Sequence, residues 1–274
     1  MSLGLENIMI NQSSPSFVKS LKIQIRVIHA LVMREIITRY GRHNLGFAWL
    51  FLEPMIFTLG VAMLWTALKA GHGNGIQIVP FAVIGYSMVL MWRNVTSRMG
   101  NAIEANTGLL FHKNVKVIDV FLARMILEIA GATISFLVLS LIFLAVGQMN
   151  LPHNFLMMAE GWFLLIWFSI ALGLFVGALF AMSEVLDRLW HAVTYLMFPL
   201  SGSAFFVYWM PQAFQDLLLY IPMVHASELI KHGYYGEIIP TFENSFYLIK
   251  WNLILTFLGL FLVKYVSKKV EAVN

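Results

Sequence analysis

The feature that most constrains this chain is a series of long stretches that contain no Asp, Glu, Lys or Arg. Three of them cover residues 129–159, 161–183 and 189–215. Runs of about 18 or more apolar residues with few charges are typical of helices that cross a membrane. Only 12% of the 274 residues are charged and none is cysteine, whereas soluble domains carry about 25% charged residues. The composition therefore excludes a soluble enzyme, a disordered chain and a disulfide-stapled secreted domain.

The apolar stretches predict an all-α polytopic membrane protein, because the alternating segments of a membrane barrel are not visible. We predict six transmembrane helices, an N-terminal interfacial amphipathic helix and re-entrant outer gate helices before the last span. In the fourth span, Gly173 and Gly177 have the spacing of a close-packing face. The predicted spans cover residues 45–68, 78–92, 120–146, 155–182, 192–209 and 246–265.

The 18 Lys and Arg residues are distributed unevenly over the predicted loops. Fourteen of them lie on one side of the membrane, mostly in the N-terminal segment and in the loop after the second span. The other side has Lys69, Lys231 and Lys250. Cytoplasmic loops carry the excess of Lys and Arg, so both termini are predicted to be cytoplasmic. The predicted organisation is a cytoplasmic segment 1–44, a membrane domain 45–269 and a tail 270–274.

Residues 17–40 have the pattern of an amphipathic helix. Apolar residues recur there every three or four positions, and basic residues follow on another face. Such a helix lies in the inner leaflet interface with its basic face toward phosphates, or it is a positive anchor without a ligand. The apolar positions are Phe17, Leu21, Ile25, Ile28, Val32 and Ile36.

The loop 97–118 lies between the second and third spans, on the predicted cytoplasmic side. A short helix is predicted over Arg98–Asn106, with Gly108 as its stop. A helix in this place is either an ordinary connector or a docking surface for a soluble partner, and the sequence leaves both open.

The segment 199–236 is interrupted by prolines but is too apolar for a water-exposed loop. Pro199, Pro211 and Pro222 break the helical pattern, so we predict short helices that re-enter the membrane from outside. Its aromatic residues form a belt at the membrane interface, or they line a path on which sugar rings stack. The aromatic candidates are Phe205, Phe206, Tyr208, Trp209 and Tyr220.

Four charged residues fall within predicted spans: Glu53, Arg124, Glu128 and Glu160. Charges at membrane depth are costly and are candidates for a function, but Glu53, Arg124 and Glu160 lie near the span ends, and we interpret the four charges as mostly structural. Arg124 and Glu128 have i,i+4 spacing and are expected to neutralise each other, and Glu53 is an alternative partner of Arg124. No series of acidic residues or histidines lies at mid-depth, which argues against a proton-driven or sodium-driven carrier.

Several catalytic patterns are missing from the sequence. No lysine follows a glycine, so the chain has no phosphate-binding loop for a nucleotide. The zinc protease and nucleophile-elbow patterns are absent, and the eight histidines show no metal-ligand spacing. We therefore predict that the chain is not an enzyme, with no catalytic residue, no metal site and no cofactor of its own.

Two stretches together resemble the permease subunits of type-2 ABC exporters. Residues 34–54 resemble the element that enters the first span, with Glu35 in place of the usual Asp. Residues 221–236 resemble the Pro-x-x-His-x-x-Glu element before the last span in the polysaccharide-exporting branch, most closely in the capsular polysaccharide exporter permease. The structural motif residues are Arg34, Arg39, Tyr40, Leu45, Gly46, Trp49, Glu53, Pro54, Arg124, Glu128, Pro222, His225, Glu228 and Tyr234.

The resemblance implies a subunit that moves lipid-linked polysaccharide across the bacterial inner membrane. It implies a second copy of the chain, two separate ATPase subunits that bind ATP and Mg, and periplasmic and outer-membrane export components, with no nucleic acid. O-antigen or teichoic-acid export is the alternative within the class, and a stand-alone secondary carrier or channel is a more distant one.

The resemblance also assigns roles to residues. The lipid phosphate of the substrate would enter at Arg34, Arg39 and Arg42. The outer aromatics would line the gate. The ATPase would dock on a coupling segment that contains Arg98, Glu104, Asn106, His112 and Lys113.

Overall fold

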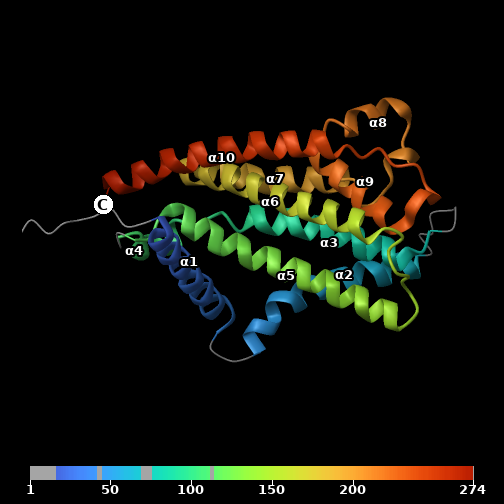
Figure 1. Cartoon of the computed structure of the whole chain (residues 1–274), viewed down its shortest axis with the longest axis horizontal. Coiled ribbons are helices and arrows are strands. Elements are labelled where there is room, and N and C mark those ends of the chain that lie inside the picture. The colour runs from blue at the N-terminus through green and yellow to red at the C-terminus, as the bar shows by residue number, and fades with distance from the viewer. Residues whose placement is uncertain (1–16, 42–44, 69–75, 112–113, 274) are drawn as a thin grey trace, which may run out of the picture.

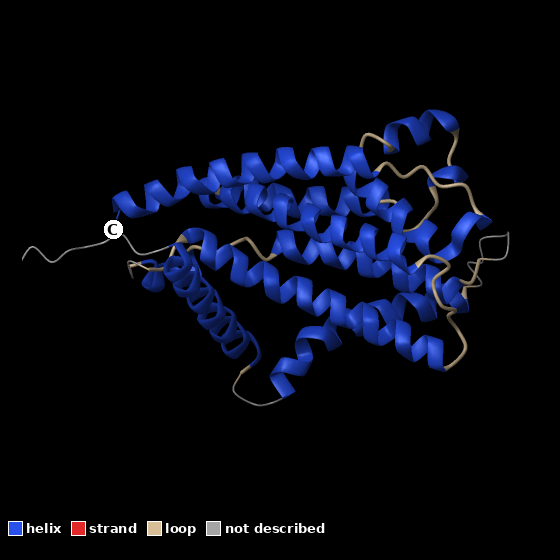
Figure 2. Ribbon diagram, in the orientation of Figure 1, coloured by secondary structure: helices blue, strands red, loops and turns tan. Residues whose placement is uncertain are grey.

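The computed structural model describes residues 17–41, 45–68, 76–111 and 114–273. Figures 1 and 2 show that every regular element in these ranges is a helix. The elements are α1 (Phe17–Tyr40), α2 (Leu45–Ala67), α3 (Ile78–Ser97), η1 (Glu104–Asn106), α4 (Thr107–Leu110), α5 (Val117–Ala145), α6 (Phe155–Met182), α7 (Glu184–Leu200), η2 (Val207–Trp209), α8 (Gln212–Leu218), α9 (Pro222–Tyr235), η3 (Gly236–Ile238) and α10 (Ser245–Val273).

Five of the described helices are long and apolar enough to cross a membrane: α2, α3, α5, α6 and α10. They confirm the predicted first, second, third, fourth and sixth spans as helices. The helix of the second span extends beyond the predicted segment 78–92 and ends at Ser97. It has 20 residues, the length that a membrane crossing needs. The described part of the chain is thus a multi-span helical bundle.

The prediction of a fifth span over 192–209 is wrong in its bounds. The helix there is α7, which begins at Glu184 and ends at Leu200 with 17 residues. At 1.5 Å per residue it is about 25 Å long, short of the roughly 30 Å hydrocarbon core. Glu184 and Asp187 lie in the first turn of α7, where acidic side chains interact favourably with the helix dipole.

The short helix predicted over Arg98–Asn106 is also wrong. Turns follow α3, and the helical residues are η1 and α4. Asn101 has a φ of 53°, a left-handed conformation that interrupts a right-handed helix. Gly108 lies inside α4 and does not end it.

The core of the bundle forms around α3 and α6. In the span of α3, 72% of the residues are buried, against 22% for α10. α6 packs against α10, α9 and α3. The small residues predicted to form a close-packing face do so, because a Cβ at Gly173 would lie 2.9 Å from Met125 and one at Gly177 would lie 3.0 Å from Met99.

The helix α7 packs against α6 and α3 within the bundle, whereas most of the other segments outside the five spans lie at its two ends. Figure 1 shows α1 and α4 at the end where the C-terminus lies, with α8 and α9 toward the other end. α1 is inclined to the spans and packs against α5 and α2. The predicted coupling and outer segments therefore lie at opposite ends of the molecule.

Candidate functional site

An ionic network joins α1 to α5. Arg39 is paired with Glu128, and its Nη2 lies 2.8 Å from Glu35 Oε1. Arg124 Nε lies 3.1 Å from the same Glu35 oxygen. The prediction that Arg124 and Glu128 neutralise each other is wrong, since each pairs across the helix interface. The alternative contact between Glu53 and Arg124 is not among the ion pairs of the described residues.

The spacing within each helix explains this exchange of partners. Glu35 and Arg39 are four residues apart on the face of α1 toward α5, and Arg124 and Glu128 are four apart on the facing helix. Glu35 is 9% exposed and Glu128 is 6% exposed. Buried carboxylates are costly unless they are paired and hydrogen-bonded, so separating the two helices would remove the Arg39–Glu128 and Arg124–Glu35 pairs that stabilise them.

The same network reaches the loop after α3. Arg98 Nε lies 3.4 Å from Glu128 Oε1. Arg124 Nη1 donates to the carbonyl oxygens of Arg98 at 2.9 Å and Gly100 at 3.1 Å. Arg34 Nη1 donates to Asn106 Oδ1. The loop is therefore held to α1 and α5 by polar contacts.

These contacts surround a cavity of about 290 Å³, which we call the arginine cavity. Burial alone would lower the pKa of Arg39, but the carboxylates of Glu128 and Glu35 raise that pKa above its ordinary value. Arg39 therefore remains a cation that is paired with both carboxylates. The cavity is lined by Arg34, Glu35, Thr38, Arg39, Arg98, Ala105, Asn106 and Arg124.

The predicted phosphate-entry and coupling residues are partly brought together in this cavity. Arg34 and Arg39 come from the entry set, and Arg98 and Asn106 come from the coupling set. Sequence reasoning placed these two sets in separate sites. Of the remaining residues, Glu104 is exposed and lines another cavity, and Arg42, His112 and Lys113 lie outside the described residues.

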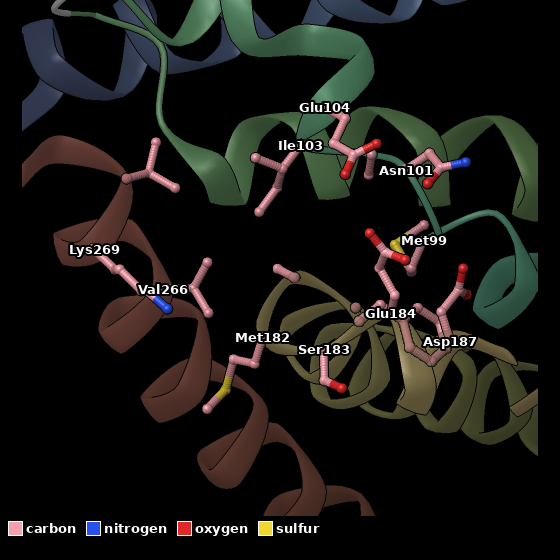
Figure 3. A pocket seen from close by; sticks show the side chains of 15 residues that line it. Met99, Asn101, Ile103, Glu104, Met182, Ser183, Glu184, Asp187, Val266 and Lys269 are labelled. Atoms are coloured by element: carbon pink, nitrogen blue, oxygen red, sulfur yellow. The ribbon is translucent and has the colours of Figure 1, made fainter. Parts of the chain in front are cut away.

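A second cavity, of about 280 Å³, lies between the coupling segment, the start of α7 and the end of α10. Figure 3 shows Glu104, Glu184 and Asp187 on one side of it and Lys269 on the other. Glu104 is exposed. The cavity places acidic side chains at the end of the bundle that also carries the C-terminus.

At the other end of the bundle, a buried ion pair holds the segment between α7 and α8 against α9. Lys231 Nζ lies 2.6 Å from Glu228 Oε1 and donates to the carbonyl oxygens of Gly202 at 3.0 Å and Phe205 at 2.6 Å. Glu228 also accepts from the backbone N–H of Val207 at 3.4 Å. Sequence reasoning counted Lys231 among exposed loop cations. Its i,i+3 spacing from Glu228 was the signal available for this pair.

The predicted gate aromatics separate into two groups. Phe205 and Phe206 are buried, and the Phe206 ring lies 5.0 Å from Trp209 and 4.5 Å from the Lys231 ammonium. Tyr208 is 51% exposed and Tyr220 is 74% exposed. The first two therefore belong to the packing of the outer segment, and the two tyrosines present rings at the surface.

The other motif residues mostly support helix ends and contacts between helices. Pro222 is the first residue of α9, where its fixed φ suits a helix start. The His225 Nε2 atom lies 2.9 Å from the carbonyl oxygen of Leu219, and the ring packs on Tyr247 at 4.8 Å. Ser245 Oγ donates to Glu160 at 2.9 Å.

The motif at the entry to the first span includes the end of α1 and the start of α2. Tyr40 is the last residue of α1, and Gly46 lies in α2. Trp49 is half exposed, whereas Pro54 is buried inside α2 with Thr58 Oγ1 donating to its carbonyl oxygen at 2.9 Å. Pro54 has no N–H, so α2 lacks the helical hydrogen bond that residue 54 would donate one turn earlier.

Comparison with known proteins gives matches over nearly the whole chain. Residues 26–235 match the family profile described as ABC-2 type transporter. The capsule polysaccharide export inner-membrane protein CtrC of Neisseria meningitidis serogroup B is 45% identical, over 93% of this chain and 97% of that protein. The protein of the same description in Haemophilus influenzae, BexB, is 41% identical over the same shares. The polysialic acid transport protein KpsM of Escherichia coli is 30% identical over 89% and 94%.

Proposed function

The chain belongs to the ABC-2 type transporter family, and from that premise we propose that it is the membrane-spanning subunit of a capsular polysaccharide exporter in the bacterial inner membrane. The observation that carries this proposal is the likeness to two proteins named for capsule polysaccharide export, each above 40% identity over 93% of the chain. The five apolar helices support a multi-pass membrane location.

We propose that ATP is hydrolysed, with Mg, on two separate partner subunits that bind a homodimer of this chain. The partner would contact the coupling segment, where Glu104 is exposed beside the cavity in Figure 3. This end also carries the C-terminus and would lie in the cytoplasm with the N-terminus, as the distribution of Lys and Arg favours. α7 would then form the fifth crossing together with the segment that follows it, and the outer end would meet the periplasmic and outer-membrane components.

The substrate would follow a path between the two ends. Its anionic lipid end would meet Arg34, Arg39 and Arg42, because guanidinium groups bind phosphate through paired hydrogen bonds. The exposed rings of Tyr208 and Tyr220 would then contact the sugar chain at the outer end. Stacking on aromatic planes tolerates many sequences, as it does for bases in single-stranded nucleic acids.

Complementation tests the proposed function. In a capsulated bacterium that lacks its own permease, this chain and its ATPase partner are expected to restore polysaccharide on the cell surface. Restoration should fail when the ATPase partner carries an inactivated nucleotide site. Surface polysaccharide that stays absent although the chain is inserted and bound to the ATPase would refute the proposal.

Docking on the coupling segment has its own test. Glu104→Lys is expected to reduce the amount of ATPase that copurifies with the chain, because it reverses the charge on an exposed part of the segment. Glu237→Lys is the matched control, since Glu237 is also exposed but lies beyond α9. Equal copurification from both variants would contradict the docking assignment.

A further inference from the structure

The arginine cavity has more positive charge than its own carboxylates neutralise. Two of its guanidinium groups come from α1, one from the end of α3 and one from α5. Among the described residues that line it, Glu35 is the one carboxylate, and Glu128 reaches its edge through ion pairs with two of the arginines. Four positive and two negative charges leave a net charge of +2, so the site attracts an anion.

The geometry of the cavity suits a phosphate group. Its volume of about 290 Å³ is far above the roughly 10–15 Å³ that a single water requires. Guanidinium groups present planar pairs of N–H donors that match phosphate oxygens and bind them bidentately. Asn106 and Thr38 add neutral polar groups to the same lining.

The position of α1 favours a membrane lipid as the source of the phosphate. Phe17, Leu21 and Ile25 on α1 are exposed, although they are large and apolar. An amphipathic helix with such a face lies at the level of the lipid headgroups. The cavity is lined by the C-terminal end of the same helix and is therefore at headgroup depth, where lipid phosphates are available.

Among the polar contacts that hold the coupling segment to this cavity, one comes from Arg34 on α1. Arg34 Nη1 donates to Asn106 Oδ1, while Asn106 Nδ2 donates to the carbonyl oxygen of Ala102 at 2.8 Å. Asn106 is 3% exposed and is the last residue of η1. Its amide offers Arg34 one neutral acceptor oxygen, whereas a phosphate offers charged oxygens that a guanidinium can bind through two parallel bonds. A phosphate in the cavity would therefore compete successfully for Arg34.

We propose that the arginine cavity binds a phosphate group, and that the phosphate takes Arg34 from Asn106 and so loosens the coupling segment. Binding of the phosphate would thus change the mobility of the surface on which the ATPase docks. The inference deepens the proposed function and rests on it for one point, that the phosphate belongs to the exported lipid-linked substrate.

A spin label on the coupling segment tests this inference with the full chain in nanodiscs. The chain has no cysteine, so Gly108→Cys provides a single labelling site, and no atom lies within 4 Å of a Cβ there. In wild-type background, phosphatidic acid is expected to raise the mobility of the label above that in phosphatidylcholine alone. Arg98→Gln should need about tenfold more phosphatidic acid for the same change, since one charge-assisted bond is lost.

Two further variants distinguish loss of the Arg34–Asn106 hydrogen bond from loss of a positive charge on α1. Arg34→Gln should give a mobile label in both lipids, because the bond to Asn106 is already gone. Arg26→Gln removes the same charge from an exposed position on the same helix and should behave as the wild type. A label that moves equally in both lipids in the wild type, or an Arg26→Gln variant that matches Arg34→Gln, would overturn the proposal.

Other outcomes identify the source of the anion. If inorganic phosphate added to phosphatidylcholine nanodiscs also raises the mobility, the site stands and takes soluble phosphate. If neither probe acts but the ATPase partner changes the label in an Arg34-dependent way, the cavity takes a partner carboxylate and the proposal is wrong. Because the readout involves no export, a failed complementation with a responsive label would remove the proposed function and leave the phosphate site.

Discussion

The buried ion pair of α9 gives the sharpest prediction, which concerns Lys231→Met. Methionine keeps most of the apolar stem of lysine but removes the ammonium. The change breaks the 2.6 Å contact with Glu228 and the bonds to the carbonyl oxygens of Gly202 and Phe205. It leaves the Glu228 carboxylate, which is fully buried, with long contacts of 3.4 Å to the backbone N–H groups of Val207 and Phe242.

The expected loss follows from the buried, unpaired carboxylate. Removing one member of a buried ion pair costs about 3–5 kcal/mol. For a chain of this size each kcal/mol lowers the melting temperature by about 2–4 °C, so the expected decrease is about 6–20 °C. The double variant Glu228→Gln with Lys231→Met removes both charges and should recover much of the loss, because replacing a whole buried pair is often close to neutral.

The assay is thermal unfolding of the purified full chain in detergent, followed by tryptophan fluorescence. Lys250→Met is the matched control, since Lys250 is exposed and its loss should leave the melting temperature nearly unchanged. A Lys231→Met melting temperature equal to that of Lys250→Met would refute the reasoning. So would a double variant less stable than the single one, because that would mean that the unpaired carboxylate is not the cause.

Two other predictions concern packing and acid stability. A Cβ at Gly233 would lie 2.4 Å from a backbone nitrogen of α6, so Gly233→Ala should destabilise the chain by about 1–3 kcal/mol and Gly108→Ala, which meets no neighbour, should not. Burial of the Glu243 carboxyl tends to raise its pKa. Hydrogen bonds to Thr241 and His232 outweigh this effect and lower the pKa below its ordinary 4.5. The stability that Glu243 contributes is therefore present above pH 4.5 and is lost as the pH falls through the lower folded-state pKa. Glu243→Gln should remove this acid-dependent part from melting temperatures measured between pH 6 and 3, and an unchanged pH profile would contradict it.

The sequence was most informative where one apolar pattern decided the structure. The apolar stretches predicted all five of the long helices and the class of the fold, because a run of about 20 apolar residues has few alternatives in a membrane. The pattern failed at α7, where acidic residues of a first helical turn resemble those of a loop. It failed again at Asn101, whose left-handed backbone is set by local geometry that hydrophobic periodicity does not report.

The candidate sites were predictable only as residue types. The motif identified Arg34, Arg39 and Glu128 as notable, but partners in an ion network depend on which helix faces which. The i,i+4 rule pairs Arg124 with Glu128 within α5, and the packing of α1 against α5 overrides it by offering Glu35. Lys231 was missed for the same reason, since its burial depends on a segment more than twenty residues away.

The bonds made by Lys231 and Glu228 also affect how the outer end moves. The irregular backbone between Gly202 and Val207 is tied at both of its ends to side chains of one helix. Local opening of that segment would require exposure of a buried charge pair, so its free energy of opening should be close to that of α9. The backbone amides of this non-helical stretch should therefore be protected from hydrogen exchange as strongly as those of α9. The stretch and the helix would then open together as one unit.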